Sequence, residues 1–403
     1  MKKLLAGLLV LASFSLQACG QGSGPHRPEP LPGPRPAAAH TQDQAVPRID
    51  SSHDELAALI SGLPTTSAAL KKWQETPSWK DFARSVNEHW SAFDTQILGP
   101  MKKWVSEDLH DADQATQSLL YPFGGPDFAT AAALFPSATK IVLMGLEPVG
   151  NLPDFDKAAA GWADGFFKDA DTILSDFLKR GYFVTKHMNE VYSGGKVDGA
   201  LPVICFFLKR TGYSIVAVDR VTLDAKGHWQ ETPYKPIKRS PKWPYGVRID
   251  YVKASDPVLR SVFYFTCDIS NTQFIKDGPL YARFDGLEAM STFIKSGSYL
   301  LHYSEFTNLR SLILGRSLVV LQDDSGIPYR YFKDKTWTIQ LYGAYTTPVE
   351  DFSPRLEQKD LRAAYEDPEG NIKKLPFHFG YHWVSKIDNL LLARRNSAPF
   401  KNP

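Results

Sequence analysis

Apolar residues recur at helical spacing in the first half of the chain. The clearest series, three or four residues apart as one helix face requires, is Trp79, Phe82, Val86, Trp90, Phe93 and Ile97. Pro77 near its start and Gly99-Pro100 at its end predict the limits of this helix. A second helix is expected at 156–180, where Gly181 supplies a C-terminal stop. The aromatic face of the first helix is more typical of packing on a core than of ligand binding.

Short apolar runs in the rest of the chain are typical of strands. They span 140–144, 201–208, 214–223, 258–268, 318–322 and 336–342. Asp224-Ala225-Lys226-Gly227 is turn chemistry, which predicts antiparallel pairing of the strands beside it. Further helices are expected at 287–301 and 304–314. The mixture predicts an α/β or α+β fold, a mixed sheet flanked by helices, in one compact unit of residues 51–403 with possible lobes at 51–200 and 201–403.

The first twenty residues show a different pattern. Lys2 and Lys3 precede an apolar run at 4–16. This run is shorter than the ~20 residues of a membrane span and has the form of a cleaved export signal. It ends in Leu16-Gln17-Ala18-Cys19, which resembles the lipobox of bacterial lipoprotein precursors. The resemblance implies that 1–18 is a signal peptide and that Cys19 receives lipid, including acyl chains such as palmitate. An ordinary secretory signal is the alternative.

Residues 19–50 lack the apolar side chains that a core needs. Prolines stand at 25, 28, 30, 32, 34, 36 and 47. Such a chain favours polyproline II at ~3.1 Å per residue, so this linker reaches at most roughly 90 Å. Gly20 stands where the lipoprotein resemblance associates aspartate with inner-membrane retention. The implied location is therefore the cell envelope, lipid-anchored, with the outer membrane favoured in a Gram-negative organism.

Composition supports a folded domain and excludes one class of partner. Hydrophobic residues make up 43% of the chain and aromatic residues 12%, which is more than disordered chains carry. The chain has 46 basic and 44 acidic residues, and loss of Lys2 and Lys3 leaves 44 of each. A nucleic-acid-binding protein needs a clustered basic excess, so nucleic acid is not expected. The expected partners are the lipid bilayer, through acylated Cys19, and an envelope ligand or protein.

Two cysteines remain besides Cys19. Cys205 and Cys267 both lie in apolar runs that we interpret as strands. Buried free thiols are the favoured interpretation, because cysteine is among the most buried residue types. A disulfide is the alternative, since an oxidising envelope compartment permits one. Their spacing does not suit a metal site, and no cofactor is expected.

Two strand-like runs each continue into an acidic loop that contains glycine. One is Gly145-Leu146-Glu147-Pro148-Val149-Gly150, and the other is Gln322-Asp323-Asp324-Ser325-Gly326. Ligands bind beyond the carboxyl ends of strands in open α/β sheets, so these loops are the first candidate site. Neighbouring carboxylates can raise each other's pKa or share a cation. The candidate catalytic residues are Asp127, Glu147, Asp323 and Asp324.

Donor side chains can complete such a site. The candidate ligand-binding residues are Lys186, His187, Tyr329 and Arg330, which can donate hydrogen bonds to an anionic or sugar-like group. The competing interpretation is that Asp-Asp-Ser-Gly is simply turn chemistry. His378 and His382 would face the same side of a strand. Two histidines without a third ligand are nevertheless more typical of packing than of a metal site.

Established catalytic motifs such as GxSxG, HExxH and the Walker A loop are missing from the sequence. Ser137-Ala138-Thr139-Lys140 matches the SxxK of penicillin-binding proteins, but Lys140 begins a predicted strand rather than the first turn of a helix. Three phrases, at 121–128, 145–150 and 322–332, resemble those of a bacterial envelope protein family of uncharacterised activity. The resemblance spans about 121–383 and implies no mechanism.

Two functions follow from these patterns. A lipid-tethered binding or assembly protein is favoured by the long linker, the aromatic content and the missing catalytic motifs. The alternative is an envelope hydrolase, for which the loops after residues 144 and 321 should meet in one cleft. A purely structural partner of another envelope protein is a third possibility, and exposed apolar patches would be its sign.

Overall fold

The computed structural model describes residues 48–183, 188, 192, 195–238, 244–286, 289–383 and 387–396. Residues 47–403 form one compact unit. The predicted signal peptide, Cys19 and the linker up to residue 47 lie outside the described residues, as do Lys186 and His187. Within the described ranges, no helix has both the length and the apolar character to cross a membrane.

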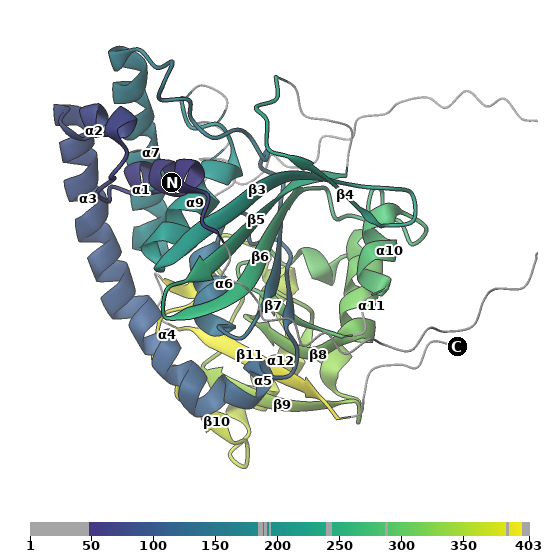
Figure 1. Cartoon of the computed structure of the whole chain (residues 1–403). Helices are drawn as coiled ribbons and strands as arrows, with labels where there is room; N and C mark the ends of the chain where they lie inside the picture. Colours follow the sequence, from purple (N-terminus) through teal and green to yellow (C-terminus); the bar gives the residue numbers. More distant parts are fainter. Residues whose placement is uncertain are drawn as a thin grey trace, which may run out of the picture. The chain divides into compact units, whose positions relative to one another are not determined.

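An eleven-stranded mixed sheet runs through this unit (Figure 1), in the order β10-β9-β11-β8-β7-β1-β2-β6-β5-β3-β4. Its middle is parallel and consists of β8 (Ser317–Gln322), β7 (Met290–Ile294), β1 (Ser118–Tyr121), β2 (Lys140–Gly145) and β6 (Asp256–Thr266). The carboxyl ends of these strands therefore lie side by side, and we call this line of strand ends the carboxyl edge. Strands from both predicted lobes share the sheet.

Antiparallel strands extend the sheet on both sides. Beyond β6 lie β5 (Tyr245–Lys253), β3 (Tyr213–Leu223) and β4 (Trp229–Pro233). Beyond β8 lie β11 (Asn389–Arg395) and β9 (Trp337–Gly343). The short strand β10 (Ile372–Lys373) completes this side and is parallel to β9. The predicted turn at 224–227 joins β3 to β4, with Gly227 at φ +80°. Because β11 runs antiparallel to β8, its first residue, Asn389, also lies at the carboxyl edge.

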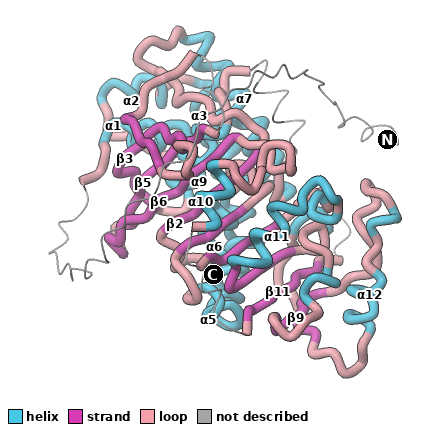
Figure 2. Tube along the Cα trace, turned by 90° about the vertical axis from the view of Figure 1, so that its right-hand side faces the viewer, coloured by secondary structure: helices cyan, strands magenta, loops and turns pink. Residues whose placement is uncertain are grey.

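Helices cover both faces of the sheet (Figures 1 and 2). One face carries α1 (Ser51–Ile60), α2 (Ala68–Gln74), α3 (Pro77–Phe93), α4 (Gly99–Trp104), α5 (His110–Asp113), α6 (Phe128–Leu134), α7 (Ala160–Arg180) and α9 (Ala200–Arg210). The other carries α10 (Pro279–Asp285), α11 (Thr307–Arg316) and α12 (Lys359–Glu366). Successive residues of a strand point to opposite faces, so Leu143 enters the first core and Met144 the second. The predicted mixed sheet flanked by helices is confirmed.

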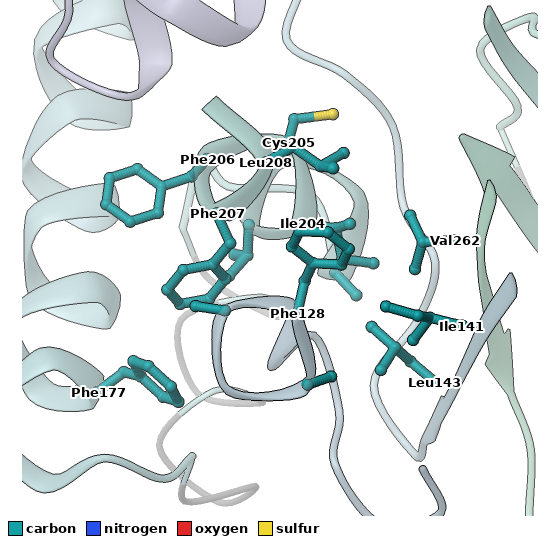
Figure 3. Close-up of a cluster of buried hydrophobic side chains, with 14 of the residues drawn as sticks. Phe128, Ile141, Leu143, Phe177, Ile204, Cys205, Phe206, Phe207, Leu208 and Val262 are labelled. Carbon is teal, nitrogen blue, oxygen red and sulfur yellow. The ribbon is translucent and has the colours of Figure 1, made fainter. Parts of the chain in front are cut away.

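The run 201–208 was predicted as a strand and is the centre of α9 instead. Its residues are buried on all sides, and periodicity alone cannot separate a fully buried helix from a buried strand. Figure 3 shows α9 packed between α7, represented by Phe177, and the strand residues Ile141 and Val262, with Phe128 of α6 beneath it. Cys205 lies on this helix. Both it and Cys267 are buried free thiols, as favoured, and burial raises the pKa of each.

Two other predicted boundaries are wrong. The first long helix does not stop at Gly99-Pro100 but passes through two π-helical turns, Asp94–Leu98 and Val105–Leu109, to Asp113. Pro100 directly follows the first π-helical turn, where Gly99 N bonds to Asp94 O, so the regular α-helical bonding that a proline would break is already interrupted there. The helix predicted at 287–301 contains β7, whose residues are all buried. By contrast, α7 ends at Arg180 with Gly181 in the left-handed region, as predicted.

Candidate functional site

All four predicted carboxylates lie at the carboxyl edge of the sheet. Asp127 follows β1, Glu147 follows β2, and Asp323 and Asp324 follow β8. Strands β1 and β7 separate β2 from β8, which places the two predicted loops about 14 Å apart at ~4.8 Å per strand. The loops after β1 and β7 lie between them. The site is therefore a row of loops, rather than one cleft formed by the two predicted loops alone.

Asp127 is held in a buried ion pair with Lys295, the first residue after β7. The side chains of Asp127 and Lys295 are 2% and 4% exposed, and Lys295 Nζ binds Asp127 Oδ2. The Asp127 carboxylate also caps α6 by accepting from Thr130 N and accepts from the Tyr121 hydroxyl at 3.0 Å. Lys295 Nζ donates further hydrogen bonds to Thr130 Oγ1 at 3.0 Å and to Gly181 O at 2.7 Å. This pair joins β7 to α6 and to the end of α7, which favours a structural role for Asp127.

Glu147 is buried beside two hydroxyl groups of β6 and two glycines. Its carbonyl oxygen accepts from the hydroxyls of Tyr264 and Thr266, both at 2.8 Å. A Cβ on Gly145 would collide with Oε2 of Glu147, and one on Gly125 would lie 3.4 Å from the same atom. Burial, and then the charge of Glu147, raise the pKa of Tyr264. These two glycines leave room for a buried carboxylate, which explains why the loops after β1 and β2 contain them.

Asp323 links the loops after β8 and β7. Its Oδ2 accepts from Ser296 N at 2.8 Å, and its Oδ1 accepts from both the amide and the hydroxyl of Ser325. Ser325 Oγ in turn accepts from Gly297 N at 2.7 Å. Burial, and then the neighbouring charge of Asp324, raise the pKa of Asp323 to about 6. Asp323 can therefore exchange a proton near neutral pH.

Asp324 points to the opposite side of the chain and ties three distant segments together. His382 Nε2 and the side-chain amide of Asn389 lie 2.9 Å and 3.0 Å from its Oδ1, and the Tyr299 hydroxyl donates to its Oδ2. Asn389 also accepts from the backbone amide of Asp324 at 2.8 Å. Burial alone would lower the pKa of His382, but the hydrogen bond and charge of Asp324 raise it overall. Asp324 is thus held in place as firmly as Asp127.

Backbone strain is concentrated at the same edge. In the ranges that the structure describes, four residues other than glycine have positive φ: Phe123 at 64°, Ser296 at 56°, Ser298 at 53° and Tyr299 at 57°. All four lie in the loops after β1 and β7. A side chain in this region costs ~1–3 kcal/mol, and such residues persist where the surroundings or a function require them.

Residues 377–383 cross over the carboxyl edge. His378 Nδ1 lies 2.6 Å from Asp388 Oδ2, Gly380 packs against Asp323, and the Tyr381 and Ser298 hydroxyls are 2.7 Å apart. Gly380 has a φ of +62°, so the chain turns here and does not form the strand assumed for the histidine pair. His378 and His382 bind different carboxylates. Among the described residues, no three His, Cys, Asp or Glu side chains are grouped as a metal site.

A small cavity lies beside the acidic pair. It has a volume of about 10 Å³ and is lined by Asp323, Asp324, Tyr329, Gln358, Asn389 and their neighbours. A cavity of this size has room for about one water molecule, so a small-molecule ligand needs this edge to open. Of the predicted donors, Tyr329 lines the cavity, whereas the Arg330 guanidinium lies over the Tyr331 ring at 5.0 Å.

The SxxK arrangement is not formed. Ser137 lies in the turn before β2, where its hydroxyl donates to Asp113, and Lys140 is the first residue of that strand. Lys140 is therefore not one helical turn from the serine, as that chemistry requires.

Lys295, Ser296, Tyr299 and Asn389 were not predicted as site residues. The first three follow β7, which the sequence pattern had assigned to a helix, so their position at a strand end was hidden. The available signal was the order of residues in Lys295-Ser296-Gly297-Ser298, a polar loop with glycine directly after an apolar run. Asn389 and His382 lie 65 and 58 residues from Asp324. No local pattern links them to it.

Asp323 gives the stability of the domain an expected pH dependence. Its pKa is raised to about 6 from 3.8, so the folded state favours the protonated acid, and the stabilisation is lost as pH rises from about 4 through 6. At ~1.4 kcal/mol per pKa unit, wild type should lose up to ~3 kcal/mol relative to Asp323→Asn over that range. Urea unfolding of both proteins at several pH values measures the difference.

The comparison with Asp323→Asn is needed because His302 acts in the opposite direction. Burial lowers the pKa of His302 to about 4, so its contribution is lost as pH falls from 6.5 towards 4. Both proteins contain His302, so its contribution cancels in the difference between them. That difference reports Asp323 together with His382, whose pKa the charge of Asp323 helps to raise. Parallel pH profiles for the two proteins would contradict the assignment.

Comparison of the chain with protein-family models, with curated proteins and with solved structures finds no match.

Proposed function

We propose that this chain is a lipid-anchored protein of the bacterial envelope, tethered through acylated Cys19, whose domain binds a polar ligand at the carboxyl edge. The observation that carries the proposal is the convergence of the loops after β1, β2, β7 and β8 on this edge. Ligand sites of open α/β sheets lie at the carboxyl ends of strands. The tether rests on the signal and lipobox residues of the sequence.

Three features that destabilise the folded state are found at the carboxyl edge, and they support the same location for the site. Backbone strain, adjacent buried carboxylates and a raised carboxyl pKa all occur at this edge. Each of these destabilises a fold unless something offsets it, and such features cluster at functional sites. A purely structural partner of another protein would have no need of them. Ligand binding therefore accounts for them better than assembly alone.

An envelope hydrolase is the second candidate, and the pKa of Asp323 favours it. A general acid or base works best with a pKa near the operating pH, and Asp323 at about 6 meets this condition. The Asp127 oxygens are occupied by Lys295, Tyr121 and Thr130 N, which makes Asp127 a poor base. Of the four predicted carboxylates, Asp323 is the best candidate for proton transfer.

Native mass spectrometry of the full lipoprotein, purified from its host in mild detergent, tests the proposal. We expect a fraction of the wild-type protein to carry a small polar molecule and Asp323→Asn to carry much less. Asp250→Asn is the matched control, because Asp250 is also buried and accepts from Ser261 near the opposite ends of the strands. A ligand-free wild-type protein, or equal loss in both variants, would count against a site at the carboxyl edge.

A further inference from the structure

We infer that the Ser296 hydroxyl is the nucleophile of the carboxyl-edge site and forms a covalent acyl ester with a carboxylic ester or amide substrate. This inference deepens the proposed function and rests on its hydrolase form. Three features of the loop after β7 support this role: the backbone at Ser296, the state of its hydroxyl and the position of Asp323.

The backbone at Ser296 makes a sharp turn immediately after a central parallel strand. One residue separates Ser296 from the end of β7, and its φ is +56°. A serine nucleophile on such a strand-to-turn elbow stands above the end of the sheet. Ser296 is a partly exposed residue with a buried hydroxyl, so a substrate reaches Oγ once this edge opens. The turn also needs a small neighbour. A Cβ on Gly297 would lie 3.0 Å from Ile294 Cγ2 and 3.1 Å from Ser325 O.

The hydroxyl of Ser296 is buried and has no hydrogen-bond partner among the described residues. A buried polar group without a partner costs ~1–3 kcal/mol. The two neighbouring serines differ, because Ser298 pairs with Tyr381 and Ser325 donates to Asp323. Ser291 also has a buried hydroxyl without a partner, but it lies within β7. Of these four serines, Ser296 is the one that combines an unpartnered hydroxyl with a strained turn at the strand end.

Asp323 is placed to take the proton from this hydroxyl. Asp323 Oδ2 accepts from the backbone amide of Ser296 at 2.8 Å. The same Oδ2 and Ser296 Oγ both lie within 3.5 Å of the point that a Cβ of Gly380 would occupy. A Cβ on Gly380 would collide with this Oδ2, so the glycine is what allows the Asp323 carboxylate to lie beside Ser296. Rotation of the Ser296 side chain can then bring its hydroxyl towards the carboxylate.

The chemistry follows from this placement. Ser296 Oγ attacks the carbonyl carbon of the substrate while its proton passes to the Asp323 carboxylate, as in general-base catalysis. The protonated Asp323 then gives that proton to the departing alcohol or amine as the carbon–oxygen or carbon–nitrogen bond breaks. A water molecule, deprotonated by Asp323, next attacks the acyl ester. Release of the acid restores the Ser296 hydroxyl when Asp323 returns the proton.

Covalent labelling of the full lipoprotein tests the inference. The purified protein is incubated with a fluorophosphonate and, separately, with the smaller phenylmethanesulfonyl fluoride, and its intact mass and peptides are measured. We expect one adduct, on Ser296, that disappears in Ser296→Ala and persists in Ser291→Ala. No adduct on the wild-type protein with either reagent, or an unchanged adduct in Ser296→Ala, would overturn the inference.

Ser296→Gly separates function from folding. Glycine adopts positive φ without strain, so this variant should unfold at the same or a higher temperature than wild type while losing the adduct. Native mass spectrometry distinguishes a wrong nucleophile from a wrong binding site. If wild type retains a ligand but takes no adduct, the nucleophile is wrong and binding stands. If neither occurs, the site itself is wrong.

Discussion

Replacement of Lys295 by alanine should cost about 3–5 kcal/mol of the free energy of unfolding, because it leaves a buried charge without its partner. Asp127 would remain at the start of α6 with one side chain, Tyr121, and one backbone amide, Thr130 N, as its donors. The hydrogen bonds of Lys295 to Thr130 and Gly181 would also be lost, which removes a link between the loop after β7 and the end of α7. Urea unfolding followed by circular dichroism measures the loss.

Two controls define what the Lys295 result means. Lys102→Ala removes an ion pair to Asp94 whose side chains are about half exposed, and such pairs contribute less than ~1 kcal/mol. The double variant Asp127→Asn, Lys295→Met removes both charges together. Its loss of unfolding free energy should therefore be smaller than the summed losses of Asp127→Asn and Lys295→Met made singly. A loss at Lys295 no larger than that at Lys102 would show that the pair does not hold the carboxyl edge together.

Gly150→Ala should be the other severe substitution, with a loss of at least ~3 kcal/mol, since a left-handed backbone costs a side chain ~1–2 kcal/mol and overpacking adds ~1–3 kcal/mol. Gly150 has a φ of +70°, and its Cβ would collide with the carbonyl of Asp198. Asn151 N donates to that carbonyl at 3.0 Å, while Ala200 N donates to Pro148 O at 2.9 Å. These bonds seat the start of α9 against the loop after β2.

Gly161→Ala is the matched control for Gly150→Ala. Gly161 lies exposed in the first turn of α7, and a Cβ there would meet nothing within 4 Å. Alanine is the better helix former, so this variant should equal wild type or exceed it by up to ~1 kcal/mol. Thermal unfolding of both variants provides the comparison. Equal unfolding temperatures for the two variants would mean that Gly150 does not pack tightly against the Asp198 carbonyl.

The sequence pattern located strands β2, β3, β6, β8 and β9 because each is a bounded apolar run. It failed at α9 and β7 for one physical reason. Both are buried on all sides, and a fully buried element shows no polar face from which its period can be deduced. Strands β1, β5 and β11 were not predicted. β1 has only four residues, which is too short for a clear period. β5 alternates apolar residues with Arg248 and Asp250 and forms a hairpin with β6, so its signal was local and was missed. β11 pairs with β8 and β9, which lie far earlier in the chain.

The candidate site was predicted in part. The loops at Glu147 and Asp323 do follow parallel strands, as the general position of α/β ligand sites suggested. Their companions were hidden, since Lys295 and Ser296 follow the misassigned β7, and His382 comes from a segment that crosses the edge. The competing turn interpretation of Asp323-Asp324-Ser325-Gly326 is also partly right. Ser325 N donates to Asp323 Oδ1 at 3.0 Å within the loop.

Hydrogen exchange measured by mass spectrometry tests the central claim, a ligand site at the carboxyl edge, most directly. The full lipoprotein is compared with and without the polar small-molecule fraction of its host's envelope. We predict slower exchange confined to 122–127, 146–150, 295–299, 323–328 and 377–383, and no such change in Asp323→Asn. Protection elsewhere on the domain, protection that survives in Asp323→Asn, or unchanged exchange throughout would contradict the claim.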